Sequence, residues 1–192
     1  MCKKILFLII CVFSFSGCRV ETQSDSSNTN RSMTTKLLSE TSFQNVCNGG
    51  KVAEAAAYDK TSGTTSPVMV FYQSDVNQSY KNDAKNFPYD WKTQNSDIQL
   101  VTCLSVIDRK EVKECPYSIE GKTYKLKLTD VKYKVKIYEA LTGVQVAEKV
   151  LALNAAKECP EFKTFNKSEF EMTEDPDYTE SVSNFINPYI TR

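Results

Sequence analysis

The segment from Tyr124 to Ile137 alternates between apolar residues and lysines. A period of two predicts a β-strand with one buried and one solvated face. The alternation changes phase once, which predicts a bulge near Thr129 and Asp130. A tight turn is expected at 140–143, followed by a returning strand over 144–153. A hairpin of this length commits the chain to a fold built on a β-sheet.

Other apolar segments predict the rest of the fold. A helix is expected over 37–46, capped by Ser39, and a second over 178–187, ended by Pro188. The elements together predict an α+β domain, in which a single antiparallel sheet of about five strands is flanked by an N-terminal and a C-terminal helix. The remaining strands are expected at 67–72, 98–106 and 111–117, the last two joined by a polar turn at 108–110.

The first 18 residues differ from the rest of the chain. Two lysines precede an apolar run over 5–15, which is too short to span a membrane, and small residues follow, as in a secretory signal. The sequence Phe15-Ser16-Gly17-Cys18 resembles the bacterial lipobox, with phenylalanine where leucine is commonest. The resemblance implies a lipoprotein signal peptide over 1–17 and a lipid, palmitate included, on Cys18. The alternative is an ordinary signal peptide with a chance cysteine.

Residues 19–36 are rich in Ser, Thr and Asn and cannot bury enough apolar surface to order themselves. We therefore expect 18–36 to be a lipidated cysteine with a flexible tether, and 37–192 to be one globular domain. The domain would lie on the extracytoplasmic side of the bacterial cell envelope. Arg19, where Asp would signal inner-membrane retention, favours the outer membrane if the host is Gram-negative.

Seven cysteines are present, and four remain once the signal and the lipidated Cys18 are set aside. An even number in an exported chain predicts a disulfide framework, and the lack of a CxxC pair argues against a metal site. With a turn at 108–110, Cys103 lies directly opposite Cys115. We therefore expect the disulfides Cys103–Cys115 and, by exclusion, Cys47–Cys159.

The chain contains no histidine, which excludes Ser-His-Asp and Cys-His nucleophilic sites and histidine metal ligands. Its 24 basic and 24 acidic residues give zero net charge, which argues against nucleic-acid binding. No cofactor, metal or catalytic residue is therefore expected. A carboxylate-dependent, glycan-acting enzyme would need two acids about 5–10 Å apart. The candidates are Asp90, Asp97, Asp108 and Glu139.

Two further features could bind a ligand. Tyr89 and Trp91 could form a small-molecule or sensory platform, although such a cluster more commonly closes a core. A basic stripe could contact anionic lipid, a polyanionic envelope polymer or phosphate, or serve only to solubilise an exposed face. The phase change would place its lysines on one side of the sheet. They are Lys125, Lys127, Lys132, Lys134 and Lys136.

An ordered series of short motifs resembles an uncharacterised family of exported bacterial proteins. The resemblance is structural and implies no activity. We therefore expect a membrane-anchored, non-enzymatic binding or scaffold module with an envelope protein or polymer as partner. The motifs are Val46-Cys47, 54–58, Pro67-Val68, 100–103, 115–117, Thr142-Gly143, Cys159-Pro160 and Pro188-Tyr189.

Overall fold

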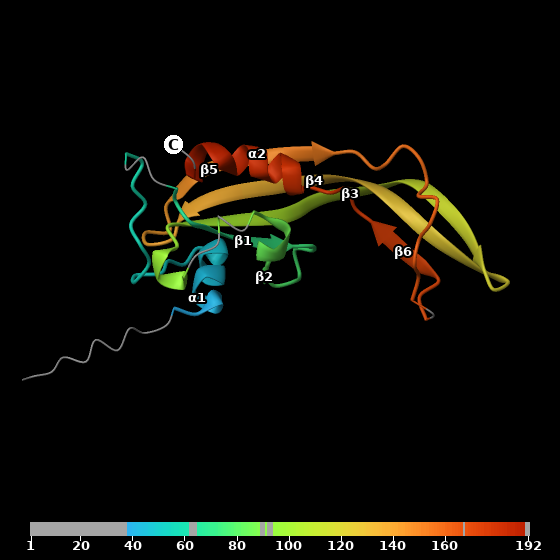
Figure 1. Ribbon diagram of the computed structural model, residues 1–192, viewed down its shortest axis with the longest axis horizontal. Coiled ribbons are helices and arrows are strands. Elements are labelled where there is room, and N and C mark those ends of the chain that lie inside the picture. Colours follow the sequence, from blue (N-terminus) through green and yellow to red (C-terminus); the bar gives the residue numbers. More distant parts are fainter. Residues whose placement is uncertain (1–37, 62–64, 89–90, 92–93, 167, 191–192) are drawn as a thin grey trace, which may run out of the picture. The chain divides into compact units, whose positions relative to one another are not determined.

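The structure is a computed structural model that describes residues 38–61, 65–88, 91, 94–166 and 168–190 (Figure 1). The predicted signal peptide, Cys18 and the predicted tether lie outside these residues. The described residues belong to one compact unit, 36–192.

A six-stranded sheet forms the centre of the domain, in the order β2-β1-β3-β4-β5, with β6 also paired to β4. β1 runs parallel to β3 and β6 runs parallel to β4, while the other pairs are antiparallel. The strands are β1 (Val68–Gln73), β2 (Lys81–Asn82), β3 (Leu100–Ile119), β4 (Lys122–Glu139), β5 (Gln145–Leu153) and β6 (Glu171–Glu174).

The expectation of a single antiparallel sheet of about five strands is therefore wrong, because the sheet is mixed. Parallel neighbours require a connection long enough to carry the chain back to the starting end of the sheet. Residues 74–99 do this between β1 and β3, and the return along β5 followed by residues 154–170 does it between β4 and β6. We call residues 154–170 the crossing loop. Both connections are polar segments whose path the local sequence pattern does not specify.

The expected turn at 108–110 is also wrong, because β3 continues through it for 20 residues. The chain reverses instead at Glu120 and Gly121, whose positive φ angles of 50° and 75° suit a two-residue hairpin turn. The register with β4 shifts twice, at Ile107 and Val112, so the bulges lie on β3 and not on β4. Ile107 and Val112 are both exposed.

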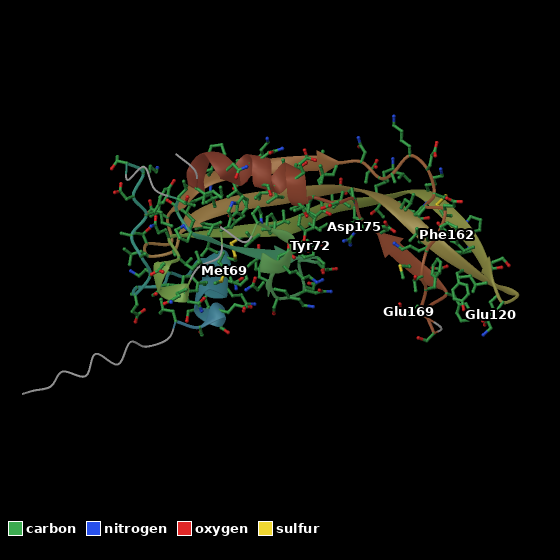
Figure 2. The ribbon with its side chains drawn as sticks, viewed as in Figure 1. Met69, Tyr72, Glu120, Phe162, Glu169 and Asp175 are labelled. Atoms are coloured by element: carbon green, nitrogen blue, oxygen red, sulfur yellow. A yellow bond between two sulfur atoms is a disulfide. The ribbon has the colours of Figure 1, made fainter. Side chains whose placement is uncertain are left out.

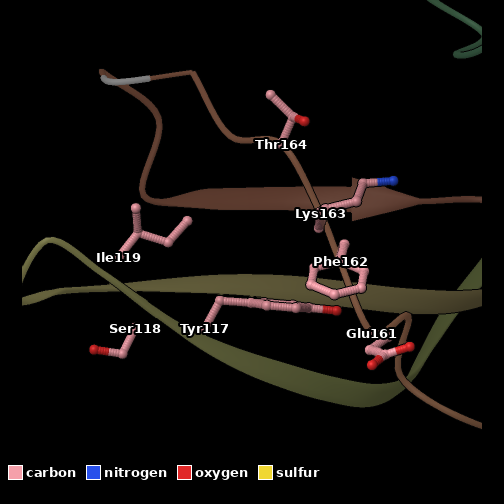
Figure 3. Close-up of a pocket in the computed structure, with 7 residues that line it drawn as sticks. All are labelled: Tyr117, Ser118, Ile119, Glu161, Phe162, Lys163 and Thr164. Atoms are coloured by element: carbon pink, nitrogen blue, oxygen red, sulfur yellow. The ribbon is translucent and has the colours of Figure 1, made fainter.

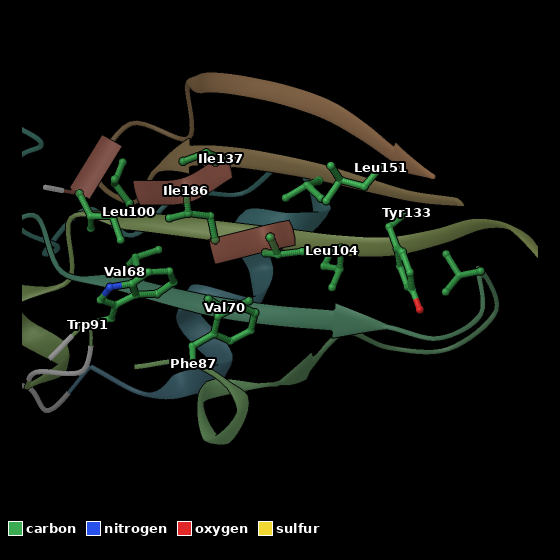
Figure 4. Close-up of a cluster of buried hydrophobic side chains, with 14 of the residues drawn as sticks. Val68, Val70, Phe87, Trp91, Leu100, Leu104, Tyr133, Ile137, Leu151 and Ile186 are labelled. Atoms are coloured by element: carbon green, nitrogen blue, oxygen red, sulfur yellow. The ribbon is translucent and has the colours of Figure 1, made fainter. Parts of the chain in front are cut away.

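The helices cover opposite faces of the sheet (Figure 1). Helix α2 (Thr179–Ile190) buries Val182 and Ile186 on one face, in a core that includes alternate residues of β1, β3 and β4 (Figure 4). Helix α1 (Glu40–Gln44) and the 3₁₀ helix η1 (Asn45–Asn48) cover the intervening residues on the other face. The remaining 3₁₀ helices with described bounds are η2 (Ala84–Asn86) and η4 (Asn95–Asp97).

One predicted helix terminus is confirmed and another is wrong. Ser39 caps α1 as expected, because its side chain accepts from the backbone N–H of Ser42. Helix α2 passes through Pro188 and ends at Ile190, three residues later than predicted. Pro188 lies in the last turn of α2, where its missing N–H removes a single helical hydrogen bond.

The phase change in β4 marks a place where the core moves to the other face of the sheet. Val131 and Tyr133 face α2, whereas Leu126 and Leu128 belong to a separate buried cluster with Cys115. No residue is inserted in β4, so alternation puts Leu126 and Leu128 on the α1 side. The crossing loop covers this cluster there. We call the paired segments 113–119 and 122–128 the distal hairpin.

Candidate interaction surface

Two disulfides join all four remaining cysteines, as the cysteine count predicts, but the predicted pairing is wrong. The pairs are Cys47–Cys103 and Cys115–Cys159, with Cα–Cα distances of 5.6 and 5.8 Å. Cys103 and Cys115 lie on the same uninterrupted strand, about 40 Å apart at roughly 3.3 Å per residue. The pairing Cys103–Cys115 depended on the turn at 108–110, which does not exist.

Each disulfide fixes a different part of the sheet. Cys47–Cys103 joins η1 to β3 inside the core on the α1 side. Cys115–Cys159 joins the crossing loop to the distal hairpin, and Cys115 is only 1% exposed. The second disulfide therefore determines where the crossing loop lies on the hairpin.

Aromatic contacts hold the crossing loop at further points. Tyr117 donates from Oη to the carbonyl of Pro160 at 2.6 Å. The ring of Phe165 lies against those of Tyr117 and Tyr124, with centroids 5.3 and 5.1 Å apart. Tyr124 also stacks on Phe170 at 5.4 Å. These contacts and the disulfide bind the loop to the hairpin on both sides of residues 161–164.

The side chain of Phe162 remains outside this packing and is 84% exposed. It lines a cavity of about 400 Å³ between the end of β3 and the crossing loop (Figure 3). Ile119, which is 37% exposed, lines the same cavity. Two exposed apolar side chains thus lie at one cavity, and apolar surface gathered in one place is a feature of binding sites. We call Tyr117, Ser118, Ile119 and Glu161–Thr164 the tip surface; Figure 2 places Phe162 and Glu120 at this end of the sheet.

Sequence reasoning did not identify Phe162 as a functional candidate, since it lies in an acidic segment whose phenylalanines resemble docking residues. Phe165 does pack on the sheet, but Phe162 does not and Phe170 is 50% exposed. A detectable signal was the position of Phe162 two residues after Cys159-Pro160, where a disulfide and a proline restrict the backbone.

Charges of both signs surround the tip surface. Glu120, Glu158 and Glu161 are exposed, and none makes an ion pair within the described part of the chain. Lys163 forms an ion pair with Glu174. Lys113, Lys122 and Lys157 are exposed cations nearby, with Lys113 Nζ donating to the carbonyl of Lys157 at 2.8 Å. Glu169 accepts a hydrogen bond from Asn166.

The five lysines of the predicted basic stripe do not share one side of the sheet. Because β4 has no inserted residue, Lys125 and Lys127 project on the α2 side, and the other three project on the α1 side. The phase change reflects a switch of the core, so the expectation that it would gather the lysines on one side is wrong.

Acidic neighbours neutralise most of these lysines. Lys127 lies 2.9 Å from Glu171, whose hydrogen bond and charge raise the pKa of the lysine. Lys132 lies 2.8 Å from Asp108, and the pKa of Asp108 is lowered by this hydrogen bond and charge. The remaining ion pairs of these lysines are Lys125–Glu114 at 3.1 Å, Lys127–Glu111 at 3.9 Å and Lys136–Glu148 at 3.6 Å. A largely paired stripe offers little positive charge to a polyanion.

Trp91 is buried at 3% exposed and stacks on Phe87, with centroids 5.7 Å apart (Figure 4). Its ring therefore closes the core on the α2 side. Tyr89 lies outside the described residues. A ligand site formed by Tyr89 and Trp91 stays a prediction.

The candidate carboxylates are spread over the domain. Asp108 pairs with Lys132, whereas Glu139 pairs with the start of β3 at Leu100, about 26 Å away at roughly 3.3 Å per residue. Asp97 is exposed in η4, and Asp90 lies outside the described residues. Across the described residues, no group of three or more acids or cysteines is placed to hold a metal. None of the helices described is long and apolar enough to span a membrane.

A separate polar cluster fixes the start of α2. Asp83, 6% exposed, accepts hydrogen bonds from Tyr178 Oη and from Asn86 Nδ2, each at 2.6 Å. Burial raises the pKa of Asp83, and burial followed by the contact with Asp83 raises the pKa of Tyr178. Tyr178 also stacks on Tyr72, with centroids 5.3 Å apart. These contacts tie α2 to the segment after β2, so the cluster has a packing role.

Comparison with protein-family models, with curated proteins and with solved structures found no match. The features that bear on function are thus those of the chain itself: two disulfides, a fixed loop and one exposed aromatic anchor.

Proposed function

We propose that the protein is a lipid-anchored binding module of the bacterial cell envelope, and that the tip surface is where it binds a partner protein. The single observation that carries this proposal is the exposure of Phe162 on a loop that a disulfide holds in place. Contiguous exposed apolar surface marks interaction sites in folded proteins, and Phe162 and Ile119 both line the tip cavity.

The two disulfides support an extracytoplasmic location, because disulfides persist in oxidising compartments. The lipobox at Phe15–Cys18 supports an anchor at Cys18, with the outer membrane favoured in a Gram-negative host. The family resemblance to exported bacterial proteins points the same way. In this proposal the protein performs no reaction.

The tip surface lies at the opposite end of the sheet from the point where the chain enters the described domain. Asn95 Nδ2 donates to the carbonyl of Leu38 at 2.6 Å, which places Leu38 near the start of β3. From Leu100 to Ile119 the strand spans about 60 Å at roughly 3.3 Å per residue (Figure 1). A module tethered upstream of Leu38 can therefore present its tip far from its attachment.

Site-specific photocrosslinking in cells tests the binding role. A benzoylphenylalanine at Thr164, which lines the tip cavity, is expected to give a discrete crosslinked product with an envelope protein. The same probe at Val76, which is 73% exposed in the β1–β2 connection, is the matched control and should give none. Equal products at both positions, or no product at Thr164, would refute the assignment of the tip surface.

Mass spectrometry of the purified protein tests the anchor separately. The expected mature N-terminus is Cys18 carrying acyl chains. An unmodified N-terminus at another residue would refute the lipid anchor and leave the binding role to the crosslinking result.

A further inference from the structure

We infer that the tip surface recognises a cationic, apolar protein segment, in which basic side chains flank an aromatic or aliphatic residue. The inference rests on the proposed function and adds the chemistry of the partner. It depends on three features of the tip surface: an apolar anchor, a cavity beside it and the unpaired carboxylate of Glu161, which lines that cavity.

The apolar part of the site comes from Phe162 and Ile119. Phe162 projects into solvent, and the cavity of about 400 Å³ beside it is large enough to receive a side chain of a partner. Tyr117, whose hydroxyl is already bonded to Pro160, presents its ring to the same cavity (Figure 3). Aromatic anchors beside a preformed pocket are the positions where binding energy concentrates in protein interfaces.

The fixed backbone lowers the cost of binding at this site. The Cys115–Cys159 disulfide and the packing of Phe165 hold the crossing loop on both sides of Phe162. A partner therefore does not have to order the loop in order to contact the ring. Pre-organisation of this kind is a general source of affinity.

The charges select the partner. Glu161 lines the cavity and makes no ion pair among the described residues. The other unpaired charges nearby, on Glu120, Glu158, Lys113, Lys122 and Lys157, are of both signs and do not line the cavity. The lining lysine, Lys163, is already paired with Glu174. Complementary charge favours a basic partner and disfavours an anionic one at such a rim.

Fluorescence anisotropy with a defined probe tests the inference. The full mature protein is held by its lipid in phosphatidylcholine nanodiscs, and the probe is a fluorescein-labelled heptapeptide that alternates lysine with leucine and phenylalanine. The matched probe replaces every lysine with glutamate, and empty nanodiscs give the background. We expect the cationic peptide to bind, the acidic peptide to bind at least about tenfold more weakly, and added salt to weaken the cationic complex.

Variants of the exposed residues assign the binding to the tip surface. Phe162→Ala is expected to weaken the cationic peptide at least about tenfold. Glu158→Gln combined with Glu161→Gln should weaken it several-fold and flatten its salt dependence. Val76→Ala, at an exposed apolar site outside the tip surface, should leave binding unchanged. Because these side chains are exposed, the variants are expected to melt like the native protein, which circular dichroism checks.

Four results would overturn the inference: no binding of the cationic peptide, equal binding of the acidic peptide, no effect of Phe162→Ala, or self-association of the protein through Phe162. If crosslinking at Thr164 succeeds while one of these results is found, the tip surface binds a partner of different chemistry. If crosslinking at Thr164 also fails, the proposed function falls with the inference.

Discussion

Removing the Cys115–Cys159 disulfide is expected to loosen the tip surface. The disulfide joins residues 44 positions apart, and the loop-entropy treatment gives it about 4 kcal/mol of stabilisation. The cluster beneath the crossing loop has only three buried apolar members, Cys115, Leu126 and Leu128. A two-stranded hairpin is marginal in water without such support. Cys115→Ala combined with Cys159→Ala should therefore lower the free energy of unfolding by about 4 kcal/mol.

The other disulfide supplies a matched control. Cys47–Cys103 joins residues 56 positions apart, so removing it is also expected to cost about 4 kcal/mol. It lies in the core on the α1 side, far from the distal hairpin. The two alanine pairs should thus lose similar global stability in urea while differing in where the structure opens.

Hydrogen exchange read by mass spectrometry distinguishes the two variants. Cys115→Ala with Cys159→Ala should speed exchange over the crossing loop and over 113–128, below the global unfolding transition. Cys47→Ala with Cys103→Ala should leave exchange at the tip unchanged relative to the native protein. Identical exchange patterns at the tip in both variants, or a stability loss under about 1 kcal/mol on removing Cys115–Cys159, would refute the idea that this disulfide braces the tip.

Three other predictions concern the body of the domain. The Oγ1 atom of Thr102 is fully buried and has no hydrogen-bond partner among the described residues. Thr102→Val is therefore expected to raise the free energy of unfolding, measured in urea, by about 1 kcal/mol. A lower free energy of unfolding would show that the hydroxyl is hydrogen-bonded in the native protein. Burial raises the pKa of Asp83, so its ionisation in the folded state weakens stability as the pH rises through that pKa. The stability of Asp83→Asn relative to the native protein should therefore increase as the pH rises above the ordinary carboxyl pKa of about 4, and a constant difference in urea titrations at each pH would contradict it. Gly143→Ala should destabilise the protein more than Gly121→Ala does. Both glycines have positive φ, but only a Cβ at Gly143 would clash, at 2.6 Å from the backbone oxygen of Gly50. Equal decreases in melting temperature for the two variants would contradict the clash.

The sequence was most informative where side chains alternate beside a short turn. The β4–β5 hairpin, β1 and the cap at Ser39 were predicted from local patterns, and all three are present. These features depend on neighbours within a few residues. Local chemistry, namely the period of burial, the turn at Gly143 and the capping hydroxyl, is enough to specify them.

Features that depend on distant contacts were predicted wrongly. Residues 108–110 are polar because β3 is solvated on both faces there, and a solvated strand has the same composition as a turn. The misplaced turn led directly to the wrong disulfide pairs. The parallel pairing of β1 with β3 depends on the path of residues 74–99, which carries no periodic pattern.

The tip surface was not predicted for a related reason. A phenylalanine in a sequence gives no indication of whether it is buried, and Phe165 and Phe162 have similar neighbours in the chain. Their difference comes from Cys159 and Tyr117, which fix the crossing loop so that Phe165 packs inward and Phe162 projects outward. Both contacts join segments more than 40 residues apart.

The most direct test of the binding role is the yield of crosslinking at Thr164 in cells that carry Phe162→Ala. If the tip surface binds through its exposed aromatic anchor, the product seen with the native side chain should fall at least about tenfold, while Val76→Ala leaves it unchanged. An undiminished product with Phe162→Ala would contradict the claim that this residue anchors a partner.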